Sequence, residues 1–261
     1  MSAVAALVYE IIQSTRARAP DRPALIGVAG AQGSGKSYAC RLLALAHQPR
    51  FAHFSLDDVY LTKAQRQQMA REVHPLFITR GPPGTHDLDV AIATIIALKM
   101  ADAAQETRFQ RFDKASDDRA PRETWPAFRG PPEAILVDGW CLGALAPPPG
   151  PPLNAIEHID SDGVWRAAQA RYLEESYADF FARFDAIVYL QAPSWEIVRT
   201  WRGEQEAQTL GRALTAQENA ALDRFVMHYE RLTRSMLAGH HMAKWIVHLD
   251  EARNVLRVEE R

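Results

Sequence analysis

The sequence predicts a doubly wound α/β domain, in which helices cover both faces of a mainly parallel, five-stranded sheet. Short, continuous apolar runs alternate along the chain with stretches of helical periodicity, a pattern typical of parallel strands that are buried on both faces. The chain has 261 residues, of which 47% are hydrophobic and 24% are charged. This length suits one large domain with a substantial core, so we expect a single domain over residues 1–261.

The order of these segments can be read along the chain. Five apolar runs are the predicted strands, and they span residues 25–29, 51–56, 134–137, 186–190 and 245–249. Periodicity and composition predict helices over residues 1–18, 36–47, 64–72, 91–105, 164–184, 195–202 and 216–237. Three loops stand out: a Pro/Gly turn over 80–85, a polar segment over 108–130 that is either an ordered loop near the site or a mobile flap, and a proline-rich surface insertion over 146–152.

Composition and charge exclude several classes of protein. The chain carries 30 Lys and Arg residues against 32 Asp and Glu residues, which argues against nucleic-acid binding through bulk positive charge. Cys40 and Cys141 are too few and too far apart for a disulfide framework or a zinc site. No apolar run approaches the roughly 18 residues of a membrane span. We therefore expect a cytoplasmic protein, monomeric or weakly self-associating, without nucleic-acid or membrane partners.

The first predicted strand leads into a glycine-rich motif of the form GxxxxGK[ST]. A strand before the motif and a helix after it complete the context of a phosphate-binding loop, or P-loop. Glycines allow successive backbone amides to converge on phosphates at the start of a helix, where the helix dipole also favours negative charge. The residues expected to bind a nucleotide here are Gly30, Ala31, Gln32, Gly33, Ser34, Gly35, Lys36, Ser37 and Tyr38.

Two side chains of this motif carry its chemistry. Lys36 supplies positive charge for the β- and γ-phosphates, and the hydroxyl of Ser37 is placed to bind Mg²⁺. The chain lacks the guanine-reading [NT]KxD motif of GTPases and the LSGGQ motif of ABC proteins. A DxxG sequence over residues 160–163 precedes a helix without a strand before it, so we interpret it as a helix-capping turn. The motif therefore indicates a nucleotide or small-molecule kinase, or an ATP-driven switch.

Acidic residues follow the two strands that should flank the first. Asp57 and Asp58 come directly after the second strand, and Asp138 follows the third. At the carboxyl ends of a P-loop sheet, a carboxylate can hold Mg²⁺ directly or through water, or accept the proton of an attacking hydroxyl. The alternatives are a helix N-cap for the first two residues and a simple turn acid for the third. Which of Asp57 and Asp58 faces the metal stays open.

Several motifs resemble those of the D-glycerate 3-kinases, the plant and fungal type of glycerate kinase with bacterial relatives. That family belongs to the P-loop kinases that include phosphoribulokinase, uridine kinase and pantothenate kinase. The resemblance extends over residues 25–258, and its most specific motif is RGPPGTHDL at 80–88. The other motifs are SLDDVYLT at 55–62, RFDK at 111–114, GWCLG at 139–143 and Trp201-Arg202.

The resemblance implies an ATP-dependent transfer to a hydroxyl of glycerate, giving 3-phosphoglycerate and ADP. By position, Asp57 matches the acid that acts as base or metal partner in the wider group, and Asp138 lies where the family has a strand-end acid. Arg202 lies in the region that forms a lid over the phosphates, about residues 195–215. Asn254 lies in a segment resembling the terminal loop near the adenine.

Two arginines lie on one face of the predicted lid helix. Arg199 lies three residues before Arg202, so one or both can reach the triphosphate. Glu206, four residues after Arg202, can instead pair with it.

The acceptor is expected to contact two loops, about 57–88 and 108–130. A carboxylate such as that of glycerate favours a planar guanidinium that binds it through two hydrogen bonds, and the candidate cations are Arg80, Lys114 and Arg119. His86 is a candidate hydrogen-bond partner for a substrate hydroxyl. The bland alternatives are solvated loop arginines and a turn histidine bonded to backbone. The remaining acceptor-loop candidates are Asp58, Tyr60 and Asp87.

These observations lead to one functional hypothesis with two alternatives. The hypothesis is a Mg²⁺- and ATP-dependent kinase for glycerate or a similar small hydroxy acid. In it, Lys36, Asp57 and Arg202 are catalytic, and Ser37, Asp57 and Asp138 hold the metal. The alternatives are a P-loop kinase for another small acceptor (a nucleoside, pantothenate or a sugar phosphate) and an ATP-binding switch without an acceptor.

Overall fold

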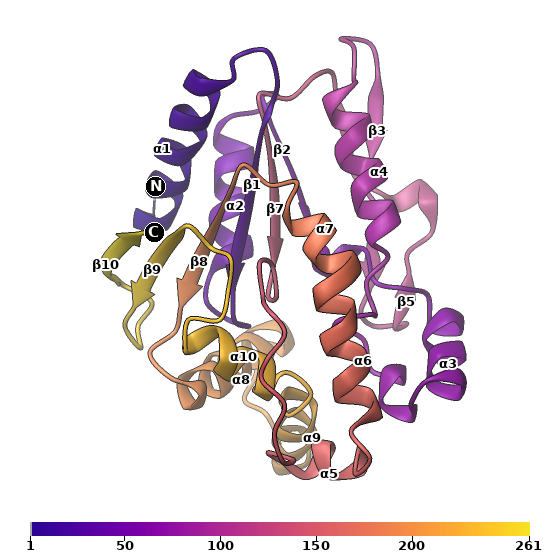
Figure 1. The fold of residues 1–261 in the computed structure, drawn as a ribbon. Helices are drawn as coiled ribbons and strands as arrows, with labels where there is room; N and C mark the ends of the chain where they lie inside the picture. Colours follow the sequence, from indigo (N-terminus) through magenta and orange to yellow (C-terminus); the bar gives the residue numbers. More distant parts are fainter. Residues whose placement is uncertain (1) are drawn as a thin grey trace.

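The structure is a computed structural model that describes residues 2–261. Its central sheet contains six strands within those residues, in the spatial order β10-β9-β8-β1-β7-β2 (Figure 1). Strand β1 lies near the middle and pairs in parallel with β7 on one side and β8 on the other. The strands are β1 (Ala24–Gly30), β2 (Phe51–Ser55), β7 (Ala134–Gly139), β8 (Ala186–Gln191), β9 (Trp245–Leu249) and β10 (Val255–Glu260).

The doubly wound, mainly parallel α/β fold is confirmed, but the predicted number of strands is too low. The sixth strand, β10, pairs antiparallel with β9 at the edge of the sheet. Its residues are half-buried or exposed, and charged residues such as Arg257 and Glu259 interrupt its apolar positions. A search for buried apolar runs therefore misses it, because an edge strand exposed to solvent does not carry that pattern.

Helices cover both faces of the sheet (Figure 1). One apolar cluster joins the sheet to α1, α2 and α8, and a second joins its opposite face to α4, α7 and α10. The helices are α1 (Ala3–Arg18), α2 (Lys36–Ala46), α3 (Lys63–Glu72), α4 (Leu88–Lys99), α5 (Ala155–Ile159), α6 (Val164–Tyr172), α7 (Ala178–Phe181), α8 (Trp195–Leu210), α9 (Ala216–Val226) and α10 (Glu230–Leu237). None of the helices within residues 2–261 combines the length and apolar character that crossing a membrane requires.

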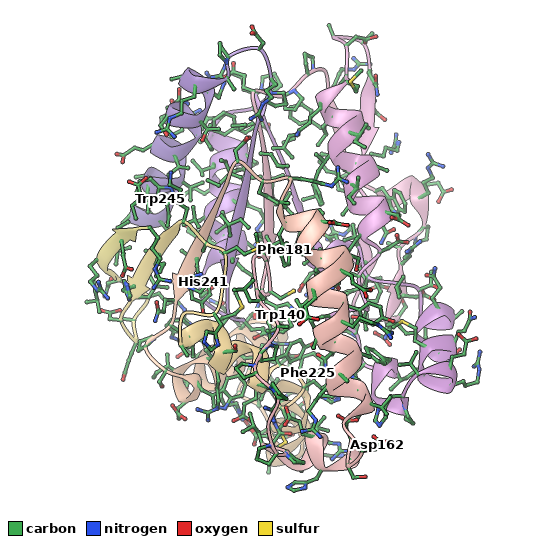
Figure 2. The ribbon with its side chains drawn as sticks, in the orientation of Figure 1. Trp140, Asp162, Phe181, Phe225, His241 and Trp245 are labelled. Atoms are coloured by element: carbon green, nitrogen blue, oxygen red, sulfur yellow. The ribbon has the colours of Figure 1, made fainter. Side chains whose placement is uncertain are left out.

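Successive side chains of each central strand point to opposite faces of the sheet, and this divides the core into the two clusters. In β7, Ile135 and Val137 pack toward α4 and α7, whereas Leu136 packs toward α1 and α2. Phe181, at the end of α7, belongs to the first of these clusters (Figure 2). Because successive side chains of a strand point to opposite faces, a fully apolar run such as β7 is what a sheet covered on both sides requires.

Of two long helices expected from the sequence, the one over 164–184 is continuous and the one over 216–237 is not. Helix α6, a π-helical turn over Leu173–Tyr177 and α7 follow one another without a break and end at Phe181. The segment 216–237 divides into α9 and α10. The expected capping turn at 160–163 is confirmed, because Asp160 accepts hydrogen bonds from the backbone amides of Trp165 and Arg166. Conversely, α8 continues to Leu210, well beyond the predicted end at residue 202.

The polar segment 108–130 is ordered by two small antiparallel ladders. Strand β3 (Glu106–Arg108) pairs with β6 (Ala127–Arg129), and β4 (Phe112–Asp113) pairs with β5 (Asp118–Arg119). Three short 3₁₀ turns connect other elements, and η3 lies in this segment. They are η1 (Leu56–Asp58), η2 (Pro75–Ile78) and η3 (Arg122–Thr124). Of the two expectations for this segment, the ordered loop therefore describes the structure.

Candidate active site

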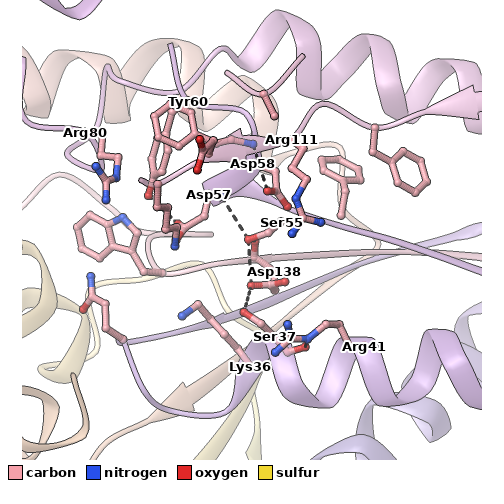
Figure 3. Close-up of a pocket in the computed structure, with 18 of the residues that line it drawn as sticks. Lys36, Ser37, Arg41, Ser55, Asp57, Asp58, Tyr60, Arg80, Arg111 and Asp138 are labelled. Atoms are coloured by element: carbon pink, nitrogen blue, oxygen red, sulfur yellow. Dashed lines mark hydrogen bonds and ion pairs between the residues drawn. The ribbon is translucent and has the colours of Figure 1, made fainter. Parts of the chain in front are cut away.

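A cavity of about 900 Å³ opens at the carboxyl ends of β1, β2 and β7. Figure 3 shows side chains converging on it from several elements. Trp140 and Phe225, which are labelled in Figure 2, also line it. The sequence-predicted residues that reach its wall are Gln32, Lys36, Ser37, Asp57, Asp58, Tyr60, Arg80, Lys114, Asp138 and Arg202.

The glycine-rich loop, residues 30–37, connects β1 to the start of α2. Gly33 has a φ of +79°, and a Cβ there would lie 2.6 Å from the Cβ of Trp201, so α8 packs directly against the loop backbone. Gly35 caps α2 in the left-handed conformation, with open space where a side chain would be. The hydroxyl of Ser34 is buried and has no hydrogen-bond partner within the described residues. An open helix N-terminus beside an unsatisfied hydroxyl suits a polyphosphate.

The turn between β9 and β10 supports this loop from outside the cavity. Arg253 donates from Nε to the backbone oxygen of Gly33 at 2.7 Å, and its guanidinium lies 4.9 Å from the ring centroid of Trp201. The indole of Trp201 donates in turn to the backbone oxygen of Glu251 at 2.8 Å. Sequence reasoning missed Arg253, because a link across 220 positions leaves no local signal.

Of the residues predicted to bind the nucleotide, those outside the cavity lining are Gly30, Ala31, Gly33, Ser34, Gly35, Tyr38 and Asn254. The last two also lie outside the glycine-rich loop itself. The amide of Asn254 donates to the carboxylate of Asp250 at 2.9 Å and so closes the β9–β10 turn. Tyr38 is 61% exposed on the outer face of α2. Both residues lie outside the cavity lining.

Asp138 is the buried centre of a polar cluster at the end of β7. Its Oδ2 accepts hydrogen bonds from the hydroxyls of Ser37 at 2.6 Å and Ser55 at 3.2 Å, and its Oδ1 lies 2.7 Å from Nε2 of His53. The pairing of β2 with β7 places Ser55 directly opposite Asp138. His53 and Ser55 were missed, although their spacing of two residues on a strand puts both on one face.

This cluster fits a magnesium ion. Hydroxyl and carboxylate oxygens are the ligands that Mg²⁺ prefers, and Ser37, Ser55 and Asp138 supply them around one point. The thiol of Cys40 also lies near Asp138 and His53, and burial raises its pKa.

Asp57 lies in the 3₁₀ turn after β2 and carries a stabilised negative charge. Burial alone would raise its pKa, but the positive charges of Lys114 and Lys36 outweigh burial and hold the pKa well below the ordinary value. The hydroxyl of Tyr60 donates to Oδ1 at 2.8 Å, and Nζ of Lys114 donates to Oδ2 at 3.0 Å. Asp57 therefore presents an ionised, positioned carboxylate to the cavity.

The neighbouring carboxyl of Asp58 is in a different environment. Burial raises its pKa, and the negative charges of Asp57 and Asp138 act in the same direction. The backbone amide of Phe112 lies 3.5 Å from Oδ1 and favours the ionised form, but it does not outweigh burial. Of the adjacent pair, Asp57 is the acid that the surroundings keep ionised most strongly.

The predicted carboxylate-binding cations are already paired with acids of the protein. Arg80 lines the cavity, where its guanidinium lies 2.5 Å from Asp117 and faces the ring of Phe112. Lys114 pairs with Asp57, as described above. Arg119 lies outside the cavity lining and pairs with Asp87 at 2.5 Å.

His86 and Asp87 are structural parts of the wall behind Tyr60. Nδ1 of His86 lies 2.6 Å from the hydroxyl of Tyr177, and its ring lies 4.9 Å from that of Tyr60, centroid to centroid. Burial lowers the pKa of His86 to about 4. Asp87 is the N-cap of α4 and accepts from the amide of Val90 at 3.2 Å. Neither His86 nor Asp87 reaches the cavity, so the structure does not bring them to an acceptor.

Arg202 reaches the cavity from α8, the predicted lid. Its Nη1 lies 2.6 Å from Glu206, the partner four residues later that the sequence offered as an alternative. Arg199 instead pairs with Asp223 and points its Nη2 at Asn219, outside the cavity lining. Of the two arginines considered for a lid, the structure brings Arg202 to the site.

Other lining residues were missed by sequence reasoning. Arg41 follows Ser37 by one helical turn on α2, and Arg111 begins the RFDK motif. Tyr229 donates its hydroxyl to the backbone oxygen of Arg80 at 2.8 Å, which joins the start of α10 to the 80–85 turn. The helical spacing of Arg41 was a usable signal, whereas the position of Tyr229 depends on packing alone.

The chain is similar in sequence to one kinase and in fold to several others. No family model matches the chain. A sequence relative, the uncharacterized kinase mug58 of Schizosaccharomyces pombe, is 26% identical over 252 residues, covering 88% of this chain and 87% of the relative. A D-glycerate 3-kinase from Cryptococcus neoformans var. grubii superposes with a TM-score of 0.77 at 20% identity, with 100% of both chains covered.

A second solved structure agrees with the first. YFH7 from Saccharomyces cerevisiae, a proposed P-loop containing kinase with a circular permutation, superposes with a TM-score of 0.54 at 10% identity, covering 94% of this chain and 98% of that one. Structural likeness at these identities establishes the fold. The chain thus has the fold of the P-loop kinases, D-glycerate 3-kinase among them, as the resemblance of its sequence motifs predicted.

Proposed function

We propose that this chain transfers the γ-phosphate of Mg·ATP to a hydroxyl of D-glycerate, giving 3-phosphoglycerate and ADP. One observation carries the proposal: the glycine-rich loop and the ionised carboxylate of Asp57 face the same cavity, with Lys36 close enough to lower the pKa of Asp57. A donor site that opens onto a positioned carboxylate suits transfer to a hydroxyl. An ATP-driven switch needs no such acceptor wall.

In the proposed reaction, the hydroxyl oxygen of the acceptor bonds to the γ-phosphorus, and the bond from that phosphorus to the β–γ bridging oxygen breaks. The electron pair of the broken bond leaves with ADP, and the hydroxyl proton passes to Asp57. Because phosphoryl transfer has a loose transition state, we expect Asp57 to orient the hydroxyl first and to take its proton late. Lys36 and Arg202 neutralise charge that accumulates on the transferred group.

The metal has a defined place in this proposal. Ser37, Ser55 and Asp138 would hold Mg²⁺, which when bound neutralises charge on the phosphates. The chain's own contribution is to keep Asp138 fixed between the two hydroxyls and His53.

Support for glycerate as the acceptor comes from the D-glycerate 3-kinase fold at full coverage and from the RGPPGTHDL motif. The test is ADP release in the presence of Mg·ATP and a panel of acceptors: D-glycerate, L-glycerate, glycerol, pantothenate, a nucleoside and ribulose 5-phosphate. Phosphorus NMR of the product distinguishes the 3-phosphate of glycerate from the 2-phosphate.

We expect ADP release that depends on D-glycerate and yields the 3-phosphate. Faster turnover of pantothenate, a nucleoside or a sugar phosphate would identify that compound, and not glycerate, as the acceptor. ADP release that no small acceptor stimulates would favour the ATP-driven switch.

A further inference from the structure

We propose that the carboxylate of the acceptor binds to Arg111, with Arg41 on the opposite wall contributing a second positive charge. This proposal rests on the proposed function, because it assumes a small hydroxy acid as the acceptor. It replaces the cations that the sequence suggested for this role.

Most of the cations near the cavity already pair with an acid of the protein. Arg80 pairs with Asp117, Lys114 with Asp57 and Arg119 with Asp87. A guanidinium or ammonium group that already binds a carboxylate must release it before it can bind another. Each of these three cations therefore has an internal competitor for an acceptor's carboxylate.

Arg202, which also lines the cavity, pairs with Glu206. Arg111 and Arg41 are the lining arginines that form no ion pair with an acid within residues 2–261. Within residues 2–261, the side chain of Arg111 makes no hydrogen bond or ion pair that meets the usual distance limits, although it lines the cavity. The side chain of Arg41 makes one hydrogen bond within the described residues, from Nε to the backbone oxygen of Ser37 at 3.2 Å. Both terminal nitrogens are therefore available to a ligand. Two arginines with unused donors thus face one cavity that also contains Asp57.

Both guanidinium groups are open to a ligand in the cavity. Figure 3 shows Arg111 and Arg41 on opposite sides of Asp138, with both guanidinium groups directed toward it. Asp58 lies beside Arg111 in Figure 3, but its carboxyl faces the amide of Phe112 and forms no ion pair with the arginine. The planar fork of Arg111 can bind both oxygens of a carboxylate while the acceptor's hydroxyl remains at Asp57.

The competing role for Arg111 is contact with the triphosphate. The two roles differ in which Michaelis constant they affect. Loss of a carboxylate contact raises KM for the acid and leaves KM for ATP nearly unchanged, whereas loss of a phosphate contact raises KM for ATP or lowers kcat.

The experiment compares Arg111→Gln and Arg111→Lys with the wild type, using D-glycerate and ATP as varied substrates. Arg122→Gln is the matched control, since Arg122 is exposed on the same segment and lies outside the cavity lining. We expect Arg111→Gln to raise KM for D-glycerate about ten- to a hundredfold, as for the loss of a charge-assisted hydrogen bond. Arg111→Lys keeps the charge without the fork and should recover part of that loss.

A readout that does not need turnover accompanies the kinetics. Calorimetric titration of D-glycerate into the protein with a non-hydrolysable ATP analogue and Mg²⁺ should show the same loss of affinity in Arg111→Gln. An unchanged KM and an unchanged affinity for D-glycerate, with a wild type that turns it over, would overturn the role of Arg111 and leave the proposed function intact. A larger effect on KM for ATP would do the same and assign Arg111 to the phosphates.

Failure of the proposed function gives a different result. In that case the wild type neither phosphorylates nor binds D-glycerate. The proposed role of Arg111 as a carboxylate-binding residue is then rejected as well.

Discussion

The imidazole of His53 lies with Nε2 2.7 Å from Oδ1 of Asp138, so one oxygen of this buried carboxylate is held by histidine while the other accepts from Ser37 and Ser55. A histidine in this position acts on the proposed metal site through the carboxylate that it orients. His53 is therefore a positioning residue in the proposed reaction.

Replacing His53 tests this relationship. We expect His53→Ala to raise the Mg²⁺ concentration needed for half-maximal activity about tenfold or more, in the range typical of residues that orient a metal ligand. The measurement is a Mg²⁺ titration of ADP release at saturating ATP and acceptor, with the melting temperature of each protein recorded. His158→Ala, at an exposed histidine of α5, is the control and should match the wild type. Unchanged Mg²⁺ dependence in a folded His53→Ala protein would contradict the positioning role.

Lys36 is the cation of the glycine-rich loop, and its Nζ lies 3.4 Å from the backbone oxygen of Ala31. We expect Lys36→Ala to lower kcat about a thousandfold or more, because an electrostatic contact to the transferred group is lost. The fold should persist, since the amino group leaves no buried acid unpaired when it is removed. Circular dichroism and thermal melting check the fold, with Lys63→Ala as the exposed control. Turnover close to that of the wild type would refute the assignment of the loop.

The low pKa of Asp57 predicts the direction in which the pH profile of activity shifts when Lys114 is removed. Burial raises this pKa, and Lys114 is the largest influence that lowers it. In Lys114→Ala the pKa of Asp57 should rise, so its carboxylate becomes protonated at a higher pH. The acid limb of kcat/KM should therefore move to higher pH in the variant than in the wild type, within the range where both remain folded. A limb at the same pH would show that Asp57 does not control it.

The choice between the two adjacent acids has its own test. We expect Asp57→Asn to lower kcat about a hundred- to ten-thousandfold, the usual contribution of a general base. Asp58→Asn should have a smaller effect, because its carboxyl faces the backbone of Phe112. Single-turnover kinetics at saturating Mg·ATP measure both variants. A greater loss in Asp58→Asn would exchange their roles.

His86 connects stability to pH. Burial lowers its pKa in the folded protein to about 4, whereas the ordinary value is 6.5. The unfolded chain therefore binds more protons at His86 between these two values, and the free energy of unfolding should fall as the pH is lowered through that window. From pH 7 to pH 5 this one residue accounts for about 2 kcal/mol. Urea denaturation at both pH values measures the change.

The matched variant for this effect is His86→Phe, which removes the titrating ring and the buried, unpartnered Nε2. Its unfolding free energy should fall less than that of the wild type over the same pH interval, whatever its value at pH 7. His158→Ala again serves as control. Equal pH dependence in His86→Phe and the wild type would assign the effect to other groups, of which buried His241 is one.

Sequence patterns predicted the central strands and the glycine-rich loop because both depend on local chemistry. β7 is apolar because both of its faces are buried, and the loop needs glycine where the backbone takes a positive φ. The proximity of Asp138 to Ser37 also followed, since parallel strands end at one edge. The roles assigned to the site residues stay predictions.

The partners of the loop arginines could not be predicted in the same way. Arg80 meets Asp117, and Arg119 meets Asp87, only because the small β4–β5 ladder folds back over the 80–88 segment. Spacing along the chain shows that charges lie in loops, but it does not show which opposite charge comes within reach. The conformation of the loops decides which cations remain for a ligand.

The contact of Arg253 with Gly33 and Trp201 has a mechanical consequence. The C-terminal hairpin, the glycine-rich loop and the middle of α8 are joined at this point by two hydrogen bonds and a cation–π contact. Any swing of α8 toward a bound nucleotide must then pivot beyond Trp201, in the outer half over residues 203–210. Arg202, immediately next to the pivot, would change its distance to the phosphates little, while the helix end sweeps through a wider arc.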